Sequence, residues 1–403
     1  MTGLPSGFKS ISGDNAAKIE RARQIFFDVF GAYGYRVLLP STLQLFGSCR
    51  DRLSPGVRSR MLSVNAPSGE TCCLRPDLTL AAVEHMGSSY SPDERPLRVC
   101  YGDRIFRIPT QPDLEVENFQ LGAELLGWEG EGADVELLTL LLNSLDALEV
   151  RNSFVVIGDV TILENLLQEV PFQTASALRD ALRMQSFTSY REILSRAPIS
   201  EALRAPLRAL PSLRGGVDAL EAAAGILPPG CPLEGIGSLL DALNFAGYKE
   251  RVFVDLSLTR ELDYYSGPIF EIFSEGQGRP VGGGGRYDGL LSSFGIIGQA
   301  TGFSLNLEQI LEKAPDPGGE RMFVMAWSGS LSPENAMLCA KYFSDRGIPL
   351  EMSWVKQRSR SVDLARHRGY RWWTDLSDDH VYDLLDNSSL PRSEFPPKGV
   401  PHA

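Results

Sequence analysis

The polar residues best placed to bind a small molecule occur in a strand-like run, Asn118-Phe-Gln-Leu-Gly-Ala-Glu-Leu125. Because side chains alternate along a strand, Gln120, Gly122 and Glu124 share one face and the apolar residues share the other. A carboxylate and an amide beside a glycine could form the floor of a site for a small polar ligand, since an interior glycine weakens a strand unless something approaches it closely. The alternative is an amphipathic strand with one solvated face.

Two further clusters combine charged groups with hydroxyl groups. Asp77 and Thr79 flank a proline-fixed turn in the run Leu74-Arg-Pro-Asp-Leu-Thr79, where they could cap a helix or bind a substrate ammonium. Charged residues and two tyrosine hydroxyls stand just before an apolar strand in the run Thr259-Arg-Glu-Leu-Asp-Tyr-Tyr-Ser-Gly-Pro268. Each cluster offers hydrogen-bond partners to a small polar molecule, and neither is specific by itself.

Four consecutive glycines precede another polar group in Val281-Gly-Gly-Gly-Gly-Arg-Tyr-Asp-Gly-Leu290. The segment lacks the G-x-x-x-x-G-K-[ST] pattern and does not open a Rossmann unit, so the usual phosphate-binding loops are excluded. Four glycines in a row cost backbone entropy. They predict either a flexible hairpin or a stretch of backbone that approaches a ligand.

The elements that must position these clusters follow from hydrophobic spacing. An amphipathic helix is expected over 15–33 with Asp14 as its N-cap, and a second helix over 133–148. Strands are expected at 96–101, 104–107, 118–125, 153–157, 251–256 and 268–273. Their long, turn-rich connections favour an antiparallel sheet in an α+β domain over a βαβ alternation.

Composition divides the chain into a core, an insertion and a C-terminal unit. Residues 160–250 are rich in Ala, Leu and Arg, and we interpret them as a helical insertion within a main domain that spans 1–313. Residues 314–320 have the composition of a linker. A small α/β unit is expected at 321–385, and the Pro/Ser-rich tail 386–403 is expected to be disordered.

Length and charge limit the classes of function. The 403 residues exceed one ordinary domain, and the formal net charge of −12 argues against non-specific binding to nucleic acids or anionic membranes. No apolar stretch is long enough to span a membrane, and residues 1–10 lack the apolar core of a secretory signal. We therefore expect a cytoplasmic protein with reduced cysteines. The spacing of its six cysteines and four histidines predicts no metal site and no Ser-His-Asp triad.

Taken in order, the polar clusters carry a resemblance that none of them has alone. Over roughly residues 4–312 the chain resembles the catalytic core of the histidyl-tRNA synthetase family, through the order Arg-Pro-Asp-x-Thr, Phe-Arg, Gln-Leu-Gly-x-Glu, Arg-x-Leu-Asp-Tyr-Tyr and Gly-Gly-Arg-Tyr-Asp-Gly-Leu. This resemblance implies a class II aminoacyl-tRNA synthetase fold, which is an antiparallel sheet flanked by helices. It also implies a homodimer formed through the helix 15–33 and the strand that ends at Pro40.

The same resemblance implies a pocket for free histidine, whose imidazole offers one donor and one acceptor and needs partners for both. Glu124 and Tyr265 would bracket the imidazole nitrogens, and Arg260 would lie near the carboxylate. The α-ammonium would be held by Asp77 together with Thr79 and Gln120. The full set of residues expected in the pocket is Asp77, Thr79, Arg107, Gln120, Glu124, Arg260, Tyr264 and Tyr265.

The nucleotide side departs from the family pattern. The synthetases carry a Glu that contacts adenine where this chain has Pro109, and an Arg that grips the phosphates where it has Gln309. Loss of this Arg removes a charge-assisted contact that phosphate recognition usually needs. Glu261 replaces a Gly of the family motif, and its carboxylate would repel a nearby phosphate.

A core that keeps the amino-acid pocket and loses the nucleotide contacts resembles the regulatory subunits of ATP phosphoribosyltransferase. These pair with the short-form catalytic subunit for the first step of histidine biosynthesis. The resemblance implies a non-catalytic chain with no cofactor, a homodimer within a larger hetero-oligomer, histidine feedback, and no nucleic-acid or membrane partner. The C-terminal unit resembles a shortened anticodon-binding domain. The alternatives are a functioning histidyl-tRNA synthetase and a stand-alone histidine-sensing module.

Overall fold

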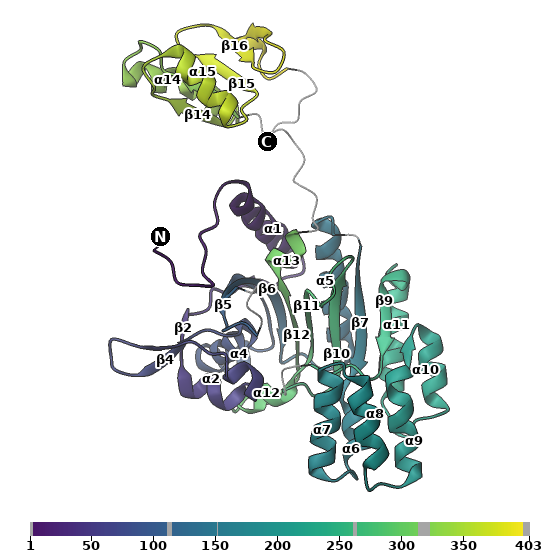
Figure 1. Cartoon of the computed structure of the whole chain (residues 1–403). Coiled ribbons are helices and arrows are strands. Elements are labelled where there is room, and N and C mark those ends of the chain that lie inside the picture. The colour runs from purple at the N-terminus through teal and green to yellow at the C-terminus, as the bar shows by residue number, and fades with distance from the viewer. Residues whose placement is uncertain (1–2, 111–114, 151, 261–263, 313–322, 398–403) are drawn as a thin grey trace. The chain divides into compact units, whose positions relative to one another are not determined.

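The computed structural model describes residues 3–110, 115–150, 152–260, 264–312 and 323–397. Contacts between residues divide the chain into two compact units, Met1–Pro315 and Asp316–Ala403 (Figure 1). The predicted linker 314–320 lies outside the described residues, as does Glu261. Each unit has its own sheet and its own apolar core.

The first unit is built on a mixed, mostly antiparallel sheet. Among the described residues its strand order is β1-β5-β6-β12-β11-β10-β7-β9-β8. The strands are β1 (Arg36–Val37), β5 (Leu97–Phe106), β6 (Glu117–Leu126), β12 (Ala300–Asn306), β11 (Gly282–Arg286), β10 (Pro268–Ser274), β7 (Ser153–Asp159), β9 (Val252–Asp255) and β8 (Arg214–Gly215). β1 is parallel to β5 and β7 to β9, and the other neighbours are antiparallel. The two strands predicted at 96–101 and 104–107 are one continuous strand, β5.

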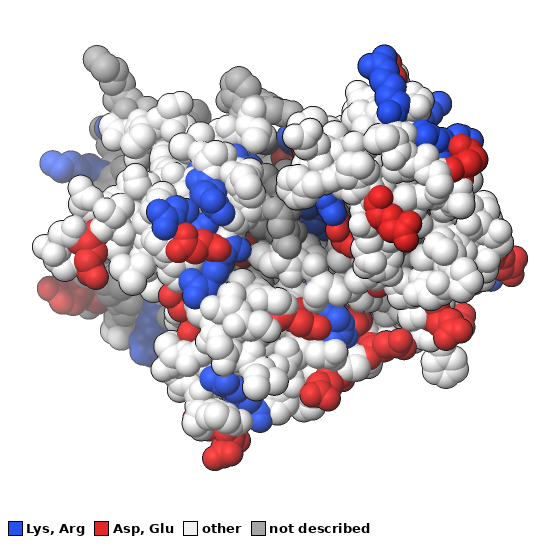
Figure 2. All heavy atoms as spheres, turned by 90° about the horizontal axis from the view of Figure 1, so that it is seen from below, with Lys and Arg blue, Asp and Glu red and all other residues white. Residues whose placement is uncertain are grey.

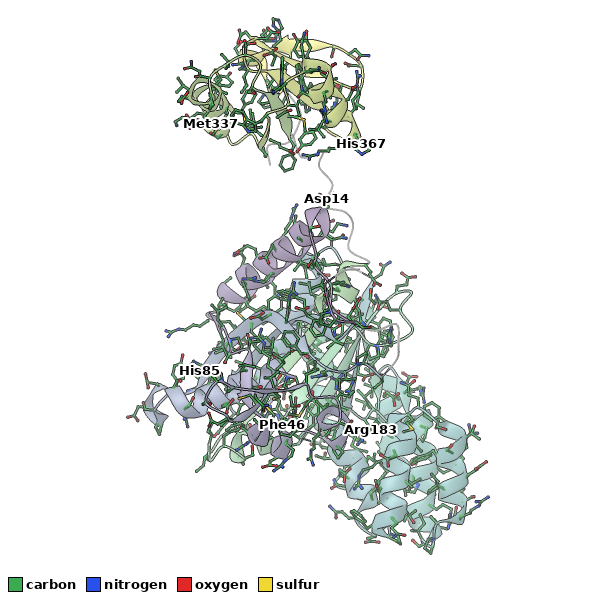
Figure 3. All side chains as sticks on the ribbon, turned by 60° about the vertical axis from the view of Figure 1, so that its left-hand side comes forward. Asp14, Phe46, His85, Arg183, Met337 and His367 are labelled. Atoms are coloured by element: carbon green, nitrogen blue, oxygen red, sulfur yellow. The ribbon has the colours of Figure 1, made fainter. Side chains whose placement is uncertain are left out.

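Helices supply two apolar cores to this sheet. The larger core contains α1 (Gly13–Gly31) and α5 (Glu131–Ala147), together with the apolar face of β6. α1 begins at Gly13, so Asp14 lies in its first turn and not at the N-cap (Figure 3). The larger core also contains the buried residues of α13 (Leu307–Leu311). The smaller core contains residues of four helices, namely α2 (Phe46–Arg52), α3 (Pro55–Arg58), α4 (Leu78–Ser89) and α12 (Asp288–Ser292). A short 3-10 helix, η1 (Pro92–Glu94), follows α4.

Two smaller parts complete the first unit. A sheet of order β2-β4-β3 precedes α4, with bounds β2 (Leu43–Leu45), β4 (Thr71–Leu74) and β3 (Ser63–Asn65). The segment predicted as a helical insertion folds as helices gathered beyond the ends of β10 and β7 (Figure 1). They are α6 (Val160–Leu167), α7 (Phe172–Arg183), α8 (Phe187–Arg196), α9 (Glu201–Ala209), η2 (Leu210–Ser212), α10 (Val217–Ala224), α11 (Leu233–Phe245) and η3 (Lys249–Arg251). Their buried apolar residues join the larger core.

The four consecutive glycines form a strand inside the main sheet. They lie in β11, which pairs with β10 on one side and with β12 on the other. A Cβ atom at Gly284 would overlap the carbonyl oxygen of Gly302, and one at Gly285 would overlap that of Pro268. The prediction of a flexible hairpin is therefore wrong, because these glycines allow close approach to neighbouring strands.

The second unit is a small α/β sheet of strand order β14-β13-β15-β16-β17. Its elements are β13 (Val324–Trp327), α14 (Pro333–Ser344), β14 (Leu350–Ser353), α15 (Arg358–His367), β15 (Trp372–Asp375), β16 (His380–Asp383), β17 (Ser389–Pro391) and η4 (Arg392–Glu394). β13 is parallel to both of its neighbours, and the last strands are antiparallel.

The expected disorder from residue 386 onward is wrong for the part of the tail that the structure describes. β17 pairs with β16 in register. Phe395 is buried, and its ring centroid lies 5.1 Å from that of Trp372. One strand pairing and one buried aromatic side chain thus order a segment whose Pro/Ser-rich composition is typical of disorder. Residues 398–403 lie outside the described residues.

The helices, the cysteines and the charged surface add four findings. No helix in the described ranges has both the length and the apolar character that crossing a bilayer requires. No group of three or more His, Cys, Asp or Glu side chains in the same ranges has an arrangement that could hold a metal ion. All six cysteines are free. Lys and Arg alternate with Asp and Glu over the face in Figure 2 and do not merge into a continuous basic surface there.

Candidate functional site

A buried carboxyl group lies at the centre of the main sheet. Glu124 on β6 has no exposed surface, and its Oε1 accepts a hydrogen bond from the Tyr101 hydroxyl at 2.6 Å. The Tyr287 hydroxyl donates a second hydrogen bond, to Oε2. The Tyr101 hydroxyl also lies 3.1 Å from Thr79 Oγ1. Side chains from β5, β6, α4 and the residue before α12 therefore form one buried network.

A glycine on the neighbouring strand makes room for this carboxyl group. Gly302 of β12 pairs with Glu124 of β6 in the sheet register. A Cβ atom at position 302 would overlap Glu124 Oε2. Position 302 is therefore restricted to glycine as long as the carboxyl group of Glu124 keeps this place.

Burial controls the charge of Glu124. Desolvation raises the pKa of its carboxyl group to about 8, and the hydrogen bonds from the two tyrosines offset this only in part. A carboxyl group with this pKa is mostly protonated at neutral pH, so it can donate a hydrogen bond as well as accept one. Burial also raises the pKa of Tyr101 and of Tyr287, which keeps both phenols as hydroxyl donors.

Asp77 and Arg107 form an ion pair at the start of α4. One carboxylate oxygen of Asp77 caps the helix by accepting a hydrogen bond from the Leu80 N–H at 2.9 Å. The other oxygen lies 3.2 Å from Arg107 Nη2, and Arg107 Nε donates to the Pro76 carbonyl at 2.6 Å. The helix-capping interpretation of this cluster is confirmed. Both side chains are thereby fixed beside Thr79.

Small side chains form a row next to the buried network. The register places Gly122 of β6, Ser304 of β12 and Gly283 of β11 beside one another, on the face of the sheet that carries Glu124. The Tyr101 ring occupies the space over Gly122, since a Cβ atom there would overlap it. The close approach expected at this interior glycine is therefore made by a tyrosine of the neighbouring strand.

Arg260 covers the other end of the row. A Cβ atom at Gly283 would overlap Arg260 Nη1, so the guanidinium group lies directly over that glycine. The same Nη1 lies 3.5 Å from Glu271 Oε1 and 3.4 Å from the Phe270 carbonyl oxygen. Ser304, in the middle of the row, is partly exposed. The row is thus covered by an aromatic ring at one end and by a cation at the other.

Two buried polar atoms on this face have no hydrogen-bond partner among the described residues. Gln120 Oε1 is an acceptor, and Arg260 Nε is a donor. Gln120 shares its face of β6 with Gly122 and Glu124. Buried polar atoms are almost always paired with protein, water or a ligand. This acceptor and this donor therefore mark the positions where a bound polar molecule would complete the site.

Tyr264 and Tyr265 connect Arg260 with the buried network. Their ring centroids lie 5.0 Å apart, and the Tyr264 centroid lies 5.7 Å from that of Tyr287. The Cζ atom of Arg260 lies 5.9 Å from the Tyr265 ring centroid. The eight residues predicted from the sequence are thus brought together on one face of the sheet.

Sequence reasoning missed four residues of this site. Tyr101, Tyr287 and Gly302 surround Glu124, and Glu271 lies beside Arg260. Tyr287 belongs to the glycine-rich motif, so its position in that motif could have indicated it. The other three reach the site through strand pairing, for which the sequence contains no local signal.

The residues that replace the family's nucleotide contacts have structural roles here. The Gln309 N–H is capped by Asn306 Oδ1 at 3.0 Å, and its carbonyl oxygen accepts from Gln277 Nε2 at 2.7 Å. Glu308 accepts a hydrogen bond from the Phe119 N–H at 2.8 Å, and burial raises the pKa of this carboxyl group. The start of α13 therefore carries an amide, Gln309, where the family pattern has an arginine.

The sequence matches the family model described as Histidyl-tRNA synthetase over residues 7–310. The ATP phosphoribosyltransferase regulatory subunit of Moorella thermoacetica is 30% identical over 314 residues, which are 76% of this chain and 81% of that protein. The protein of the same description from Syntrophotalea carbinolica is 30% identical over 391 residues, which are 95% of this chain and 87% of that protein. The second similarity therefore continues into the C-terminal unit.

Solved structures show the same likeness. A Bacillus halodurans C protein described as an ATP phosphoribosyltransferase regulatory subunit/histidyl-tRNA synthetase has a TM-score of 0.80 at 26% identity, over 93% of this chain and 97% of that one. Histidyl-tRNA synthetase from Nostoc sp. PCC 7120 has a TM-score of 0.76 at 14% identity, over 97% of this chain and 96% of that one. The predicted synthetase-like fold is confirmed.

We expect the stability of the first unit to depend on the protonation of Glu124. Because folding raises the pKa of this carboxyl group from 4.5 to about 8, the folded state favours its protonated form. The resulting stabilisation is complete below about pH 4.5 and is lost as the pH rises toward 8. Over this range the free energy of unfolding should fall relative to that of Glu124→Gln, which cannot ionise. Urea titrations read by amide exchange of β6 would measure the difference.

Glu136→Gln is the matched control for this measurement. Arg98 donates hydrogen bonds to both carboxyl oxygens of Glu136 and lowers the pKa of that carboxyl group. Its stabilisation is therefore present at neutral pH and lost on acidification, with the sign opposite to that of Glu124. Parallel pH profiles for the wild-type chain and Glu124→Gln would contradict a burial-driven shift at Glu124.

Proposed function

This chain belongs to the histidyl-tRNA synthetase family and, within it, to the ATP phosphoribosyltransferase regulatory subunits, and we propose that it is the non-catalytic, histidine-binding subunit of that enzyme. It would pair with a short-form catalytic subunit for the first step of histidine biosynthesis, in the cytoplasm. The observation that carries the histidine site is the pair Gln120 Oε1 and Arg260 Nε, which find no hydrogen-bond partner in the part of the chain that the structure describes and lie on the face of the sheet that holds Glu124.

Free histidine carries both a hydrogen-bond donor for Gln120 Oε1 and a hydrogen-bond acceptor for Arg260 Nε. Its α-ammonium is a donor suited to Gln120 Oε1 and to the nearby Asp77 carboxylate. Its α-carboxylate is an acceptor suited to Arg260 Nε, in a charge-assisted hydrogen bond. Ser304 lies between the covered ends of the row. The ligand backbone would therefore lie over Ser304 and not over Gly122.

The imidazole ring would be recognised by Glu124. A ring with an unperturbed pKa of about 6.5 faces a carboxyl group whose pKa is about 8, so one proton can be held by either partner. Protonated Glu124 donates to a neutral ring nitrogen, and ionised Glu124 accepts from an imidazolium N–H. Tyr264 and Tyr265 stand on the side of Arg260, where a hydroxyl group would serve the second nitrogen.

The nucleotide side supports a regulatory role and not amino-acid activation. Gln309 stands where a phosphate-binding arginine would be needed, and Pro109 replaces an adenine contact. A functioning histidyl-tRNA synthetase is the alternative, favoured by the C-terminal unit and by Arg107. In the structure Arg107 is held by Asp77 and by the Pro76 carbonyl. We propose the C-terminal unit as a shortened counterpart of an anticodon-binding domain.

The expected homodimer would form through α1 and the strand that ends at Pro40, and we propose that β2 extends this contact. Large apolar side chains are at least 40% exposed along this part of the chain, namely Tyr33, Val37, Leu39, Leu43 and Leu45. An exposed apolar patch of this kind typically marks a protein contact. Burial of these residues against a second copy would place a two-fold axis beside the small sheet.

We expect no histidine-dependent ATP–pyrophosphate exchange above background. Loss of the phosphate-binding arginine and of the adenine contact removes several stabilising interactions from the transition state, so the rate should fall at least about a thousandfold below that of an active synthetase. A histidyl-tRNA synthetase assayed in parallel is the positive control. Exchange at the rate of that control would favour the synthetase alternative.

We expect the chain to co-elute with a co-expressed short-form catalytic subunit in size-exclusion chromatography with light scattering. Transferase activity should require both chains, and the isolated chain should have the mass of a dimer at micromolar concentration. Leu39→Lys should yield monomers because it places a charge in the proposed contact, whereas Phe245→Lys should not, although Phe245 is 97% exposed. Separate elution of the two subunits would favour a stand-alone histidine-sensing module, and a monomeric wild-type chain would contradict the dimer.

We expect free histidine to bind the isolated chain in calorimetry, and Glu124→Ala to weaken this binding by roughly 1–3 kcal/mol because an imidazole N–H loses its buried partner. Gln120→Ala should weaken binding less specifically, and Glu221→Ala, which changes an exposed carboxylate on α10, should leave it unchanged. Inhibition of the assembled complex should shift in the same order. If Glu124→Ala changes neither the affinity nor the inhibition, histidine acts elsewhere.

A further inference from the structure

A cavity of about 710 Å³ lies where the helical insertion meets the core. Its walls come from α6 and α7 on one side and from Thr259, Arg260 and Tyr265 on the other, and Pro55 of α3 also lines it. Arg183, the last residue of α7, stands at the end of the insertion that faces the core (Figure 3). Arg260 and Tyr265 also belong to the candidate histidine site, so the cavity adjoins that site.

The charged side chains that line this cavity all have ion-pair partners. The N–O distances in the three pairs are 2.5, 3.7 and 3.5 Å, in the order Glu164 with Arg179, Asp180 with Arg183, and Glu271 with Arg260. The first pair is bidentate, which fixes both of its side chains. A charged ligand group of either sign would have to compete with these pairs. The cavity therefore suits a neutral group.

The rest of the lining is neutral and partly apolar. Val160 and Leu163 of α6 offer apolar surface together with Pro55, and Ser176 and Thr259 offer hydroxyl groups. Small-molecule sites typically measure about 300–1,000 Å³, and this cavity falls in that range. An amide with an apolar substituent matches such a lining, because hydroxyl groups can bond to the amide while the apolar side chains contact the substituent.

The carboxyl end of a bound histidine would face this cavity. Its α-ammonium is expected beside Gln120 and Asp77, where the Tyr101 ring already fills the space over Gly122. Its carboxylate is expected at Arg260 Nε, and Arg260 itself lines the cavity. An addition to the carboxyl group would therefore enter the cavity, whereas an addition to the amino group would displace the ammonium from its partners.

Conversion of the carboxyl group to an amide keeps the contact that Arg260 requires. The amide carbonyl oxygen still accepts a hydrogen bond from Arg260 Nε, and the charge of the guanidinium group remains balanced by Glu271. We propose that the histidine site also accepts the amino-terminal histidine of a peptide, with the next residue of the peptide in the cavity. This inference rests on the proposed function, because it uses the histidine site and extends its ligand.

Calorimetry with the full chain tests this inference, with L-histidine, histidyl-leucinamide and leucyl-histidinamide as the probes. The two dipeptide amides have the same composition, but only the first carries a free α-ammonium on its histidine. We expect histidyl-leucinamide to bind within about tenfold of histidine. Leucyl-histidinamide should bind at least about a hundredfold more weakly than histidine, because Gln120 and Asp77 lose the ammonium.

A substitution in the cavity separates the extension from the histidine contacts. Ser176 is half-buried on α7 and lies outside the set of residues assigned to histidine. Ser176→Trp fills part of the cavity, so it should weaken binding of histidyl-leucinamide about tenfold or more and leave the affinity for histidine within about twofold. Ser189→Trp adds the same side chain to an exposed position of α8, outside the lining, and should change neither affinity. If circular dichroism shows that Ser176→Trp does not fold, Ser176→Leu provides the same comparison with a smaller side chain.

Four results would overturn the inference while the histidine site stands. Histidine binds, but histidyl-leucinamide does not bind at millimolar concentration; or the two dipeptide amides bind equally. The folded Ser176 variant loses affinity for histidine and histidyl-leucinamide equally, or for neither, which would place the extension outside the cavity. If histidine itself does not bind, the proposed function fails, and this inference fails with it.

Discussion

A carboxyl group without access to solvent stands in the middle of the main sheet, and the surrounding residues are those that such a group requires. Burying Glu124 is unfavourable unless its oxygens receive hydrogen bonds, and the hydroxyls of Tyr101 and Tyr287 supply them. The Tyr101 ring needs the space over Gly122, and the carboxyl group needs the space over Gly302. The two strands that flank β6, which are β5 and β12, and one glycine of β6 itself are therefore needed to keep this carboxyl group away from water.

The core has two chemically different sides, one around the buried Glu124 and one at α13. On the side of Glu124, two buried polar atoms have no hydrogen-bond partner among the residues that the structure describes, the acceptor Gln120 Oε1 and the donor Arg260 Nε. On the side of α13, an acid and an amide are used for caps and backbone hydrogen bonds. This asymmetry is the basis of our proposal that the core holds an amino acid without activating it. Such a ligand changes a partner's activity only through different affinities for two states of the complex.

Which features of the structure can be predicted from the sequence depends on how far apart along the chain the interacting residues lie. Local patterns predicted α1, α5 and β6, because helical and strand periodicity are properties of neighbouring residues. The eight candidate site residues came from a family resemblance, and the structure places them on one face. Composition and single segments could not reveal what the glycines accommodate. Tyr101 reaches Gly122 through the register of β5 and β6, and Arg260 covers Gly283 from a segment outside the sheet. The prediction of a disordered C-terminal tail was wrong for a related reason, because burial of Phe395 outweighs a composition that is typical of disorder.

Whether Glu124 is the group that recognises the ligand is tested most directly by comparing histidine with 2-thienylalanine in equilibrium binding to the same preparation. The analogue keeps the α-ammonium, the α-carboxylate and a five-membered ring of similar size, but it has no ring nitrogens. With Glu124 as the buried partner of the imidazole, the analogue leaves a buried polar group unpaired, and we predict that it binds more weakly by about a hundredfold or more. Equal affinities of the two molecules would contradict recognition of the imidazole by Glu124.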